Sequence, residues 1–297
     1  MGFSVNTNLS ALSAYNSLNK TNNNLQNSLA RLSSGNRINT AGDDAAGLAI
    51  SEGLQAQISG SSVASRNAQD GISLVQTTDG ALGQVQSILH RMRDLAVQGA
   101  NDSNSADQRT AITTEANQLS DELSRMENNT TFNGVSLLKN DGTNGGTLTF
   151  QVGAGSDTAS GAPATTQDNG NTITFATIDL TTALTSNATA LDDKASGAFD
   201  VTSNAAANTT IANIDAAINN VSTQQATIGA TENRLNDAVS NLAVLGQNLS
   251  AANSRIMDTD MASEMVNYSH KSVLQQAGVS MLAQANASSQ SILKLLG

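Results

Sequence analysis

The chain has 297 residues, of which 38% are hydrophobic, 2% aromatic and 13% charged, and its formal net charge is −11. An acidic chain with only 14 Lys and Arg lacks the clustered basic side chains that nucleic-acid phosphates require, so nucleic acid is excluded as an expected partner. The absence of cysteine excludes disulfides, thiolate metal sites and cysteine nucleophiles. Because aromatic rings supply much of the buried area of a globular core, their scarcity favours narrow helix–helix contacts built from Leu, Ile, Val and Ala.

The first segment, MGFSVNTNLSALSAYNSL, has no charged leader and no long apolar run. We therefore expect neither a secretory signal peptide nor a transmembrane anchor, and no membrane partner. Taken alone, this segment predicts a cytoplasmic protein.

An apolar stripe with coiled-coil spacing begins near the N-terminus. Its members follow one another at intervals of four and three residues: Ala11, Tyr15, Leu18, Asn22, Leu25, Leu29 and Leu32. This spacing predicts a helix that packs along another helix. Asn22 interrupts the stripe, and a polar residue at such a position usually fixes the register between two helices.

Two further helices are predicted over about residues 44–100 and 105–128. The first of them contains Gly53, Gly60, Gly71, Gly80 and Gly83. Each glycine costs about 1 kcal/mol relative to alanine inside a helix. We therefore expect this helix to be stabilised by neighbours that approach it closely at the glycines.

The pattern changes after residue 128. FNGVSLL, LTFQVGAG and NTITFATIDL carry alternating β-branched residues and are broken by Asn-Gly and Gly-Gly pairs, which is typical of β-hairpins. We expect a small β region over about residues 130–200. Within it, residues 153–171 are mostly small or polar and are predicted to form an exposed loop.

Helical periodicity returns over residues 208–255 and again in a last helix up to about residue 296. The stripe of the last helix includes Leu274, Met281, Ile292 and Leu295. A short helix with such a stripe needs a partner. The expected partner residues on the N-terminal helix are Leu18, Leu25, Leu29 and Leu32. The predicted fold is mainly α: a long antiparallel helical bundle or coiled coil with paired N- and C-terminal helices and a small β-hairpin region at its tip.

The stretch RLSSGNRINTAGDDAAGLAIS, residues 31–51, has the glycines of a phosphate cradle or of a joint between two helices. A phosphate cradle follows a strand and carries a Lys, whereas this stretch follows a predicted helix and has none. Asp43 and Asp44 would also repel phosphate, and they suit the positive end of the next helix. We therefore predict a joint, with Thr40 as the N-cap of the next helix.

The residues for catalysis or metal binding are few. His90 and His270 are 180 residues apart in sequence, so no zinc-binding H-E-x-x-H motif is present. The paired acids at 43–44, 121–122 and 192–193 are better explained as helix caps or solvated faces, since adjacent helical residues do not face one another. We predict no catalytic residue, no cofactor-binding residue, no metal ligand and no enzymatic activity.

Several motifs resemble those of bacterial flagellins. They are RLSSGNRINTAGDDAAGLAIS, ILHRMRDLAVQGAND, TTFNGVSLL, FQVGAG and VLQQAGVSMLAQANASSQSILKLL, and together they span nearly the whole chain. The resemblance implies an inner-core helix and spoke at residues 1–42, an outer core domain at 43–255 and an inner-core helix at 256–297. The chain resembles a minimal flagellin with little variable sequence between these parts.

The resemblance also implies a function. Flagellins are secreted without a cleaved signal and polymerise outside the cell into the motility filament, with the help of an export chaperone and a cap protein. The self-assembled homopolymer is therefore the main expected partner. Two alternatives stay open: a hook–filament junction (hook-associated) protein, and an enzyme carried on a filament.

One helix face has two interpretations. By ordinary helix chemistry, Arg91 and Asp94 form a solvated pair three residues apart. By resemblance, Arg91, Leu95 and Glu115 match the patch through which some flagellins contact a vertebrate Toll-like receptor and pack laterally against neighbouring subunits. We expect these three residues on one exposed face, with Leu95 as an apolar contact between the two charges.

Overall fold

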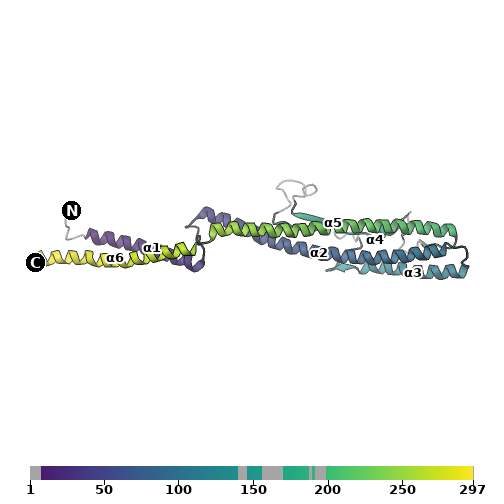
Figure 1. The fold of residues 1–297 in the computed structure, drawn as a ribbon, viewed down its shortest axis with the longest axis horizontal. Helices are drawn as coiled ribbons and strands as arrows, with labels where there is room; N and C mark the ends of the chain where they lie inside the picture. Colours follow the sequence, from purple (N-terminus) through teal and green to yellow (C-terminus); the bar gives the residue numbers. More distant parts are fainter. Residues whose placement is uncertain (1–7, 140–145, 156–169, 187–188, 191–198, 297) are drawn as a thin grey trace. The chain divides into compact units, whose positions relative to one another are not determined.

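The computed structural model describes residues 8–139, 146–155, 170–186, 189–190 and 199–296, and it describes no side chains at 185–186, 189–190 and 289–296. The elements in chain order are α1 (Leu9–Ser34), α2 (Ala45–Gly99), α3 (Ala106–Asn129), β1 (Thr131–Phe132), β2 (Val135–Ser136), β3 (Thr147–Gln151), β4 (Thr172–Ala176), α4 (Leu180–Leu184), β5 (Thr185–Ser186), β6 (Thr189–Ala190), α5 (Asn204–Met257) and α6 (Met261–Leu296) (Figure 1). The predicted mainly helical fold is confirmed.

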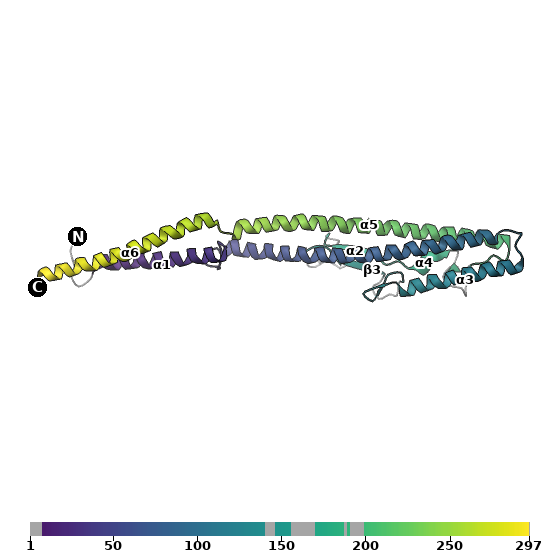
Figure 2. The same cartoon turned by 60° about the horizontal axis from the view of Figure 1, so that its bottom comes forward.

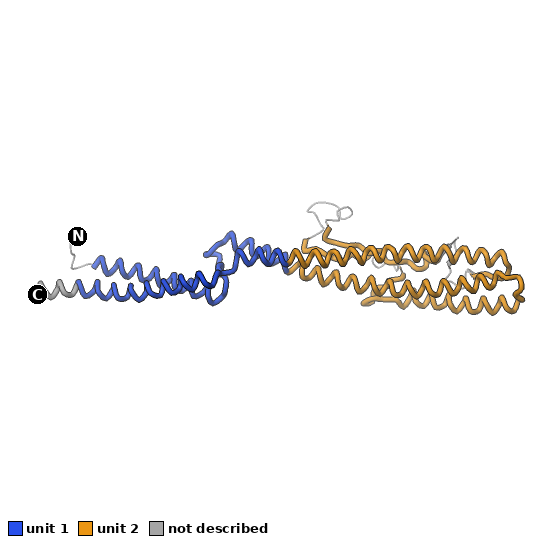
Figure 3. The backbone as a smooth tube through the Cα atoms, in the orientation of Figure 1, with its two compact units in different colours: residues 1–58, 247–297 blue, residues 59–246 orange. Residues whose placement is uncertain are grey.

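The chain divides into two compact units (Figure 3). Unit 1 comprises residues 1–58 and 247–297, and unit 2 comprises residues 59–246. The long helices α2 and α5 contribute residues to both.

In unit 1, α1 and α6 lie side by side and antiparallel (Figures 1 and 2). The Asn8 side chain, which also caps α1, donates to the carbonyl of Ala285, while Lys271 contacts Ser28 at the other end of α1. The predicted pairing of the terminal helices is confirmed. Helix α1 ends at Gly35, whose left-handed backbone (φ 75°) closes the last turn through its N–H to Arg31.

In unit 2, α2 and α5 are antiparallel and linked by polar side chains. Gln76 donates a hydrogen bond to Glu232. Gln86, ten residues further along α2, donates one to Ser222, which comes ten residues before Glu232 in α5. On either side of these contacts the two helices bury one shared apolar core, together with α3, α4 and the β3–β4 hairpin. The fully buried large side chains of that core are Leu82, Leu89, Met92, Leu123, Leu137, Leu138, Leu180, Leu184, Ile214, Ile228 and Leu235.

The strands form three two-stranded antiparallel sheets among the described residues. Asn133 and Gly134 both have positive φ (50° and 80°), which fits the two-residue turn that joins β1 and β2. In the β3–β4 hairpin, Thr147 pairs with Ala176 and Gln151 with Thr172. Most of the loop predicted at 153–171 lies outside the described residues.

The glycines of α2 meet close neighbours at two of the five predicted positions. A Cβ on Gly60 would lie 2.7 Å from the Cβ of Ala154, and one on Gly71 would lie 3.1 Å from the ring of Phe150. At Gly53, Gly80 and Gly83 nothing lies within 4 Å, so the expectation of close neighbours is wrong there for the single chain. These contacts place the β3–β4 hairpin beside the middle of α2.

Candidate functional site

The contact between α1 and α6 is built around a buried polar cluster. Ser28 is 1% exposed and Glu264 is 8% exposed. Lys271 Nζ donates to Ser28 Oγ at 2.7 Å. The Ser28 hydroxyl, and next Asn267, Lys271 and Arg31, lower the pKa of Glu264 against the opposing effect of burial. The sequence stripe did not include these polar residues, because hydrophobic periodicity ignores them.

The predicted apolar stripes take only part in this contact. Leu18, Leu25 and Leu32 are half-buried, and the Leu18 side chain lies against Gly278 of α6. Leu29, Leu274 and Met281 are 55%, 46% and 65% exposed, so the prediction that they pair α1 with α6 within one chain is wrong. The side chains of Ile292 and Leu295 lie outside the described residues. The stripes mispredicted the contact because each helix carries apolar residues on more than one side. Periodicity alone does not show which side meets the partner helix.

As a result, both helices expose large apolar side chains. They are Leu9, Leu12, Tyr15 and Leu29 on α1, and Met261, Met265, Val266, Val273, Leu274, Val279 and Met281 on α6. At 100° per residue, Leu274 and Val279 lie about 140° apart around the helix axis. Helix α6 is therefore apolar on several sides that α1 does not cover, which is the pattern of a helix surrounded by others.

The joint between α1 and α2 pairs with the joint between α5 and α6. The backbone N–H of Arg37 donates to the carbonyl of Met257 at 2.5 Å, and that of Thr259 donates to Gly35 at 2.9 Å. The Arg37 guanidinium donates to the carbonyl of Ile256 at 2.7 Å. The stretch at 31–51 is thus a joint, as predicted.

The start of α2 differs from the prediction in its cap. Asp44, not Thr40, caps the helix, since its Oδ1 accepts from the backbone N–H of Gly47 at 2.9 Å. Asp43 closes the turn before it: the backbone N–H groups of Thr40 and Asn39 donate to its carboxylate and lower its pKa. Thr40 therefore donates its backbone N–H to the Asp43 carboxylate and does not cap α2. Both Thr and Asp are good N-caps, so residue type alone could not choose between them.

Gly47 fills a position with no room for a side chain. A Cβ there would lie 2.8 Å from the Cδ1 of Ile38 and 2.5 Å from the Oδ2 of Asp44. Ile38 is 2% exposed, so it anchors the joint against the first turn of α2. The absence of a side chain at Gly47 thus makes room for the Ile38 side chain.

The predicted pair of charges on α2 and α3 comes together. Arg91 donates through Nε and Nη2 to Glu115 Oε1, at 2.9 and 2.6 Å, and both side chains are about half exposed. The ion pair of Arg91 is therefore with Glu115 on α3 and not with Asp94. Leu95 is 2% exposed and belongs to the core, so the expectation of an apolar surface contact between the two charges is wrong. It lies in the shared apolar core of unit 2.

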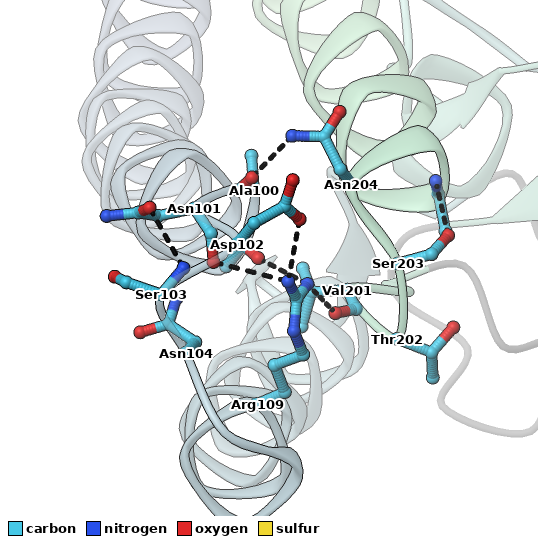
Figure 4. A network of polar contacts seen from close by, with 12 residues as sticks. Ala100, Asn101, Asp102, Ser103, Asn104, Arg109, Val201, Thr202, Ser203 and Asn204 are labelled. Atoms are coloured by element: carbon cyan, nitrogen blue, oxygen red, sulfur yellow. Dashed lines mark hydrogen bonds and ion pairs between the residues drawn. The ribbon is translucent and has the colours of Figure 1, made fainter.

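A polar cluster that sequence reasoning missed joins three segments of unit 2 (Figure 4). Arg109, at the start of α3, donates through Nη1 to the carbonyls of Gly99 and Val201, at 2.6 and 2.8 Å. Its Nη2 donates to the carbonyl of Asn101 and pairs with Asp102. We call these five residues the Arg109 clasp. Nothing in the sequence marks them, because three of the four acceptors are backbone carbonyls and one of these, that of Val201, is 92 residues away.

The described residues bear on metal binding and on membranes. No group of three or more His, Cys, Asp or Glu side chains is placed to hold a metal ion in this part of the chain. No described helix combines the length and apolar character that a membrane crossing requires.

A cavity of about 510 Å³ lies between the β3–β4 hairpin and α5 and carries Arg234, Asp237 and Asn241 among its lining residues.

The family comparisons cover both helical regions. The sequence model described as "Bacterial flagellin N-terminal helical region" matches residues 5–143. The one described as "Bacterial flagellin C-terminal helical region" matches residues 211–296. These ranges contain α1–α3 at one end and most of α5 and α6 at the other.

Individual relatives match along nearly the whole chain. A "Flagellin" of Bacillus subtilis is 40% identical over 98% of this chain and 99% of its own. A "Flagellin" of Halalkalibacterium halodurans is 43% identical with the same coverage. A "Flagellar filament 33 kDa core protein" of Treponema phagedenis is 38% identical, again over 98% and 99%. A crystal structure of Bacillus cereus flagellin is 33% identical over 63% of this chain and 94% of that one, with a TM-score of 0.46.

Proposed function

Because the chain belongs to the bacterial flagellin family, we infer that the exposed apolar residues of α1 and α6 are the surface through which its copies polymerise. A flagellin is a structural subunit of the bacterial flagellar filament, and this is the function of the chain. Nothing in the comparisons favours a hook–filament junction protein or an enzyme carried on a filament. We add the proposal that the chain has no catalytic role.

The observation that carries this inference is the exposure of α6. Val266 and Val273 are 69% and 63% exposed, as are most of the apolar residues around them. Burying such a side chain stabilises an assembly by roughly 1.5–3 kcal/mol. Neighbouring copies that cover several sides of α6 would therefore supply a large driving force, while the α1–α6 contact itself stays polar.

The domain roles follow from this arrangement. We propose that residues 1–42 and 256–297 form the inner core of the filament, with residues 31–42 as the spoke, and that residues 43–255 form the outer core. The seam residues Leu18, Leu25, Leu29, Leu32, Leu274, Met281, Ile292 and Leu295 would then lie inside the polymer. Leu29, Leu274 and Met281, which the single chain exposes, would be covered there by other copies.

The test is seeded polymerisation of the purified chain, measured by sedimentation and electron microscopy. The wild-type chain should form long filaments, whereas a junction protein would not. Val266→Asp with Val273→Asp should abolish elongation but leave the thermal unfolding of unit 2 unchanged, because neither residue belongs to that unit. Deleting the last 20 or so residues should have the same effect. Normal filaments from both variants would show that α6 is not the assembly surface.

We further propose secretion to the cell exterior, with a flagellar export chaperone and a cap protein as partners. Exposed apolar surface of this extent normally needs cover in a soluble monomer. The proposal predicts that wild-type protein reaches the culture medium only when the chaperone is present in the cell. Equal secretion without any chaperone would contradict it.

We also propose that the Arg91–Glu115 pair belongs to a patch for lateral packing and for a host Toll-like receptor. The support is its exposure and its charge, together with the family resemblance. Leu95 is left out of this patch because it is buried.

A further inference from the structure

The methionines of the chain are distributed unevenly between core and surface. Met261, Met265 and Met281 are 47%, 51% and 65% exposed, and all three are in α6. Met92 is fully buried in the core of unit 2. Met126 and Met257 are half-buried. Exposed methionine is therefore concentrated on the helix that carries the assembly surface.

Two of the exposed thioethers share one side of α6, and one of these lies in a shallow hollow on the helix. Met261 and Met265 are four residues apart, so they lie on one side of α6, one turn from each other. Met265 shares a shallow hollow with Val266, Ser269, His270 and Val273. A neighbouring copy that covers this side of α6 would enclose the sulfur atoms of Met261 and Met265, whereas Met281, about 160° around the helix from Met265, needs cover on another side.

Oxidation by hydrogen peroxide converts the apolar methionine side chain into a polar one. The thioether sulfur attacks one oxygen of hydrogen peroxide, an S–O bond forms and the O–O bond breaks. The sulfur loses two electrons, and the second oxygen leaves as hydroxide and takes up the proton of the transferred group to become water. The product, methionine sulfoxide, is polar, and it disrupts contacts that methionine makes as an apolar side chain.

We propose that oxidation of α6 at two places, the Met261–Met265 pair and the separate Met281, controls polymerisation. Peroxide converts the three thioethers to sulfoxides in the free subunit, and the oxidised subunit no longer joins a filament. Subunits already in a filament are protected, because the neighbouring copies cover α6. This inference rests on the proposed assembly role of α6.

The first test compares free subunits with filaments. Both are exposed to dilute hydrogen peroxide, and each methionine is followed by peptide mass spectrometry. In the free subunit, the three α6 methionines should oxidise at least tenfold faster than Met92. In filaments their oxidation should slow at least fivefold. Equal rates in the two states would overturn the claim of protection.

The second test measures elongation of preformed seeds by peroxide-treated subunits. Wild-type subunits should lose at least tenfold in elongation rate, and an enzyme of the methionine sulfoxide reductase class should restore it. Met261→Leu with Met265→Leu and Met281→Leu should keep elongating after treatment, whereas the control Met92→Leu should remain as sensitive as wild type. Leucine is close to methionine in volume, so such exchanges are usually tolerated.

Two results would overturn the proposal: undiminished elongation by fully oxidised wild-type subunits, or loss of elongation that the reductase does not reverse. The reductase measurement needs no variant, so it decides the matter even if the triple variant folds poorly. Failure of untreated wild-type subunits to elongate at all would instead contradict the proposed function.

Discussion

Lys271 Nζ lies 2.7 Å from Ser28 Oγ and so joins α6 to α1 across 243 residues of sequence. The Ser28 hydroxyl in turn lowers the pKa of the buried Glu264. The terminal helices of one chain are thus held together by a small polar cluster, while most of their apolar side chains face outward. Under the proposed assembly surface, contact within the chain and contact between chains depend on different residues and can be tested separately.

The polar cluster predicts a pH dependence. The pKa of folded Glu264 is held below its ordinary value of 4.5, chiefly by the Ser28 hydroxyl. The carboxylate therefore contributes stability that is fully present above pH 4.5 and is lost as the pH falls through the lower, folded pKa. The critical concentration for polymerisation should therefore stay constant above pH 4.5 and rise as the pH falls below it. The critical concentration of Glu264→Gln should rise less steeply with falling pH than that of wild type. The critical concentration of Glu52→Gln, at an exposed site on α2, should change with pH as that of wild type does. An unchanged pH profile in Glu264→Gln would refute this role.

Gly47→Ala should weaken the joint. The added methyl group would overlap Ile38 and the capping carboxylate of Asp44, and overpacking of this kind costs about 1–3 kcal/mol. The critical concentration for polymerisation should therefore rise roughly fivefold or more. Gly42→Ala is the matched control, because its methyl group would meet only Thr40 Oγ1, at an ordinary 3.6 Å. Equal behaviour of the two variants would mean that the joint adjusts to the extra methyl group.

Arg109→Ala should destabilise unit 2. The substitution leaves the carbonyls of Gly99 and Val201 without their donor, and an unsatisfied buried acceptor costs about 1–3 kcal/mol. We expect the melting temperature of the monomer to fall by several degrees, measured by circular dichroism. Arg125→Ala serves as the control: it removes an exposed pair with Glu122 within one helix and should change nothing measurable. Similar melting temperatures for both variants would show that the Arg109 clasp is dispensable.

Alanine substitutions at two glycines of α2 should distinguish effects on the stability of the subunit from effects on the shape of the filament. Gly71→Ala should destabilise the monomer, because its methyl group would press on the Phe150 ring from 3.1 Å. Gly80→Ala has open space and should stabilise the helix by up to about 1 kcal/mol. If Gly80→Ala nevertheless changes filament waveform in electron micrographs, the glycine is required at a contact between copies. An unaltered waveform would assign Gly80 no role in supercoiling.

Arg91→Ala should weaken activation of a Toll-like receptor reporter by purified monomer at least tenfold, since an Arg at the centre of an interface is often a major contributor. It should also impair motility if the same face packs laterally. A charge exchange, Arg91→Glu with Glu115→Arg, keeps an ion pair within the chain and should still fail to activate. Dose–response curves that superimpose on those of wild type would show that Arg91 takes no part in receptor activation.

The long helices were predictable because each carries an apolar stripe over many turns and ends at a recognisable signal. Gly35 is such a signal, and its left-handed backbone does end α1. The side on which α1 meets α6 was not predictable. Ser28 and Glu264 look like surface residues in the sequence, and only the positions of Lys271 and Arg31 explain their burial.

The Arg109 clasp and the burial of Leu95 show two other limits. Backbone carbonyls have no sequence signature, so the acceptors of Arg109 could not be found before the fold was known. Leu95 was placed on the surface by resemblance, and its burial became clear only from the packing of unit 2.

The adjacency of Gln151 and Thr172 in the β3–β4 hairpin has a consequence for what the chain can carry. The connection between these strands leaves and returns at nearly the same point, so a longer connection changes only loop-closure entropy, about 0.6 kcal/mol for each doubling of length. A foreign domain whose own termini lie close together can therefore be inserted there without altering strand pairing. Each polymer would then display that domain at the regular spacing of its subunits, which makes the hairpin a natural attachment point for multivalent display.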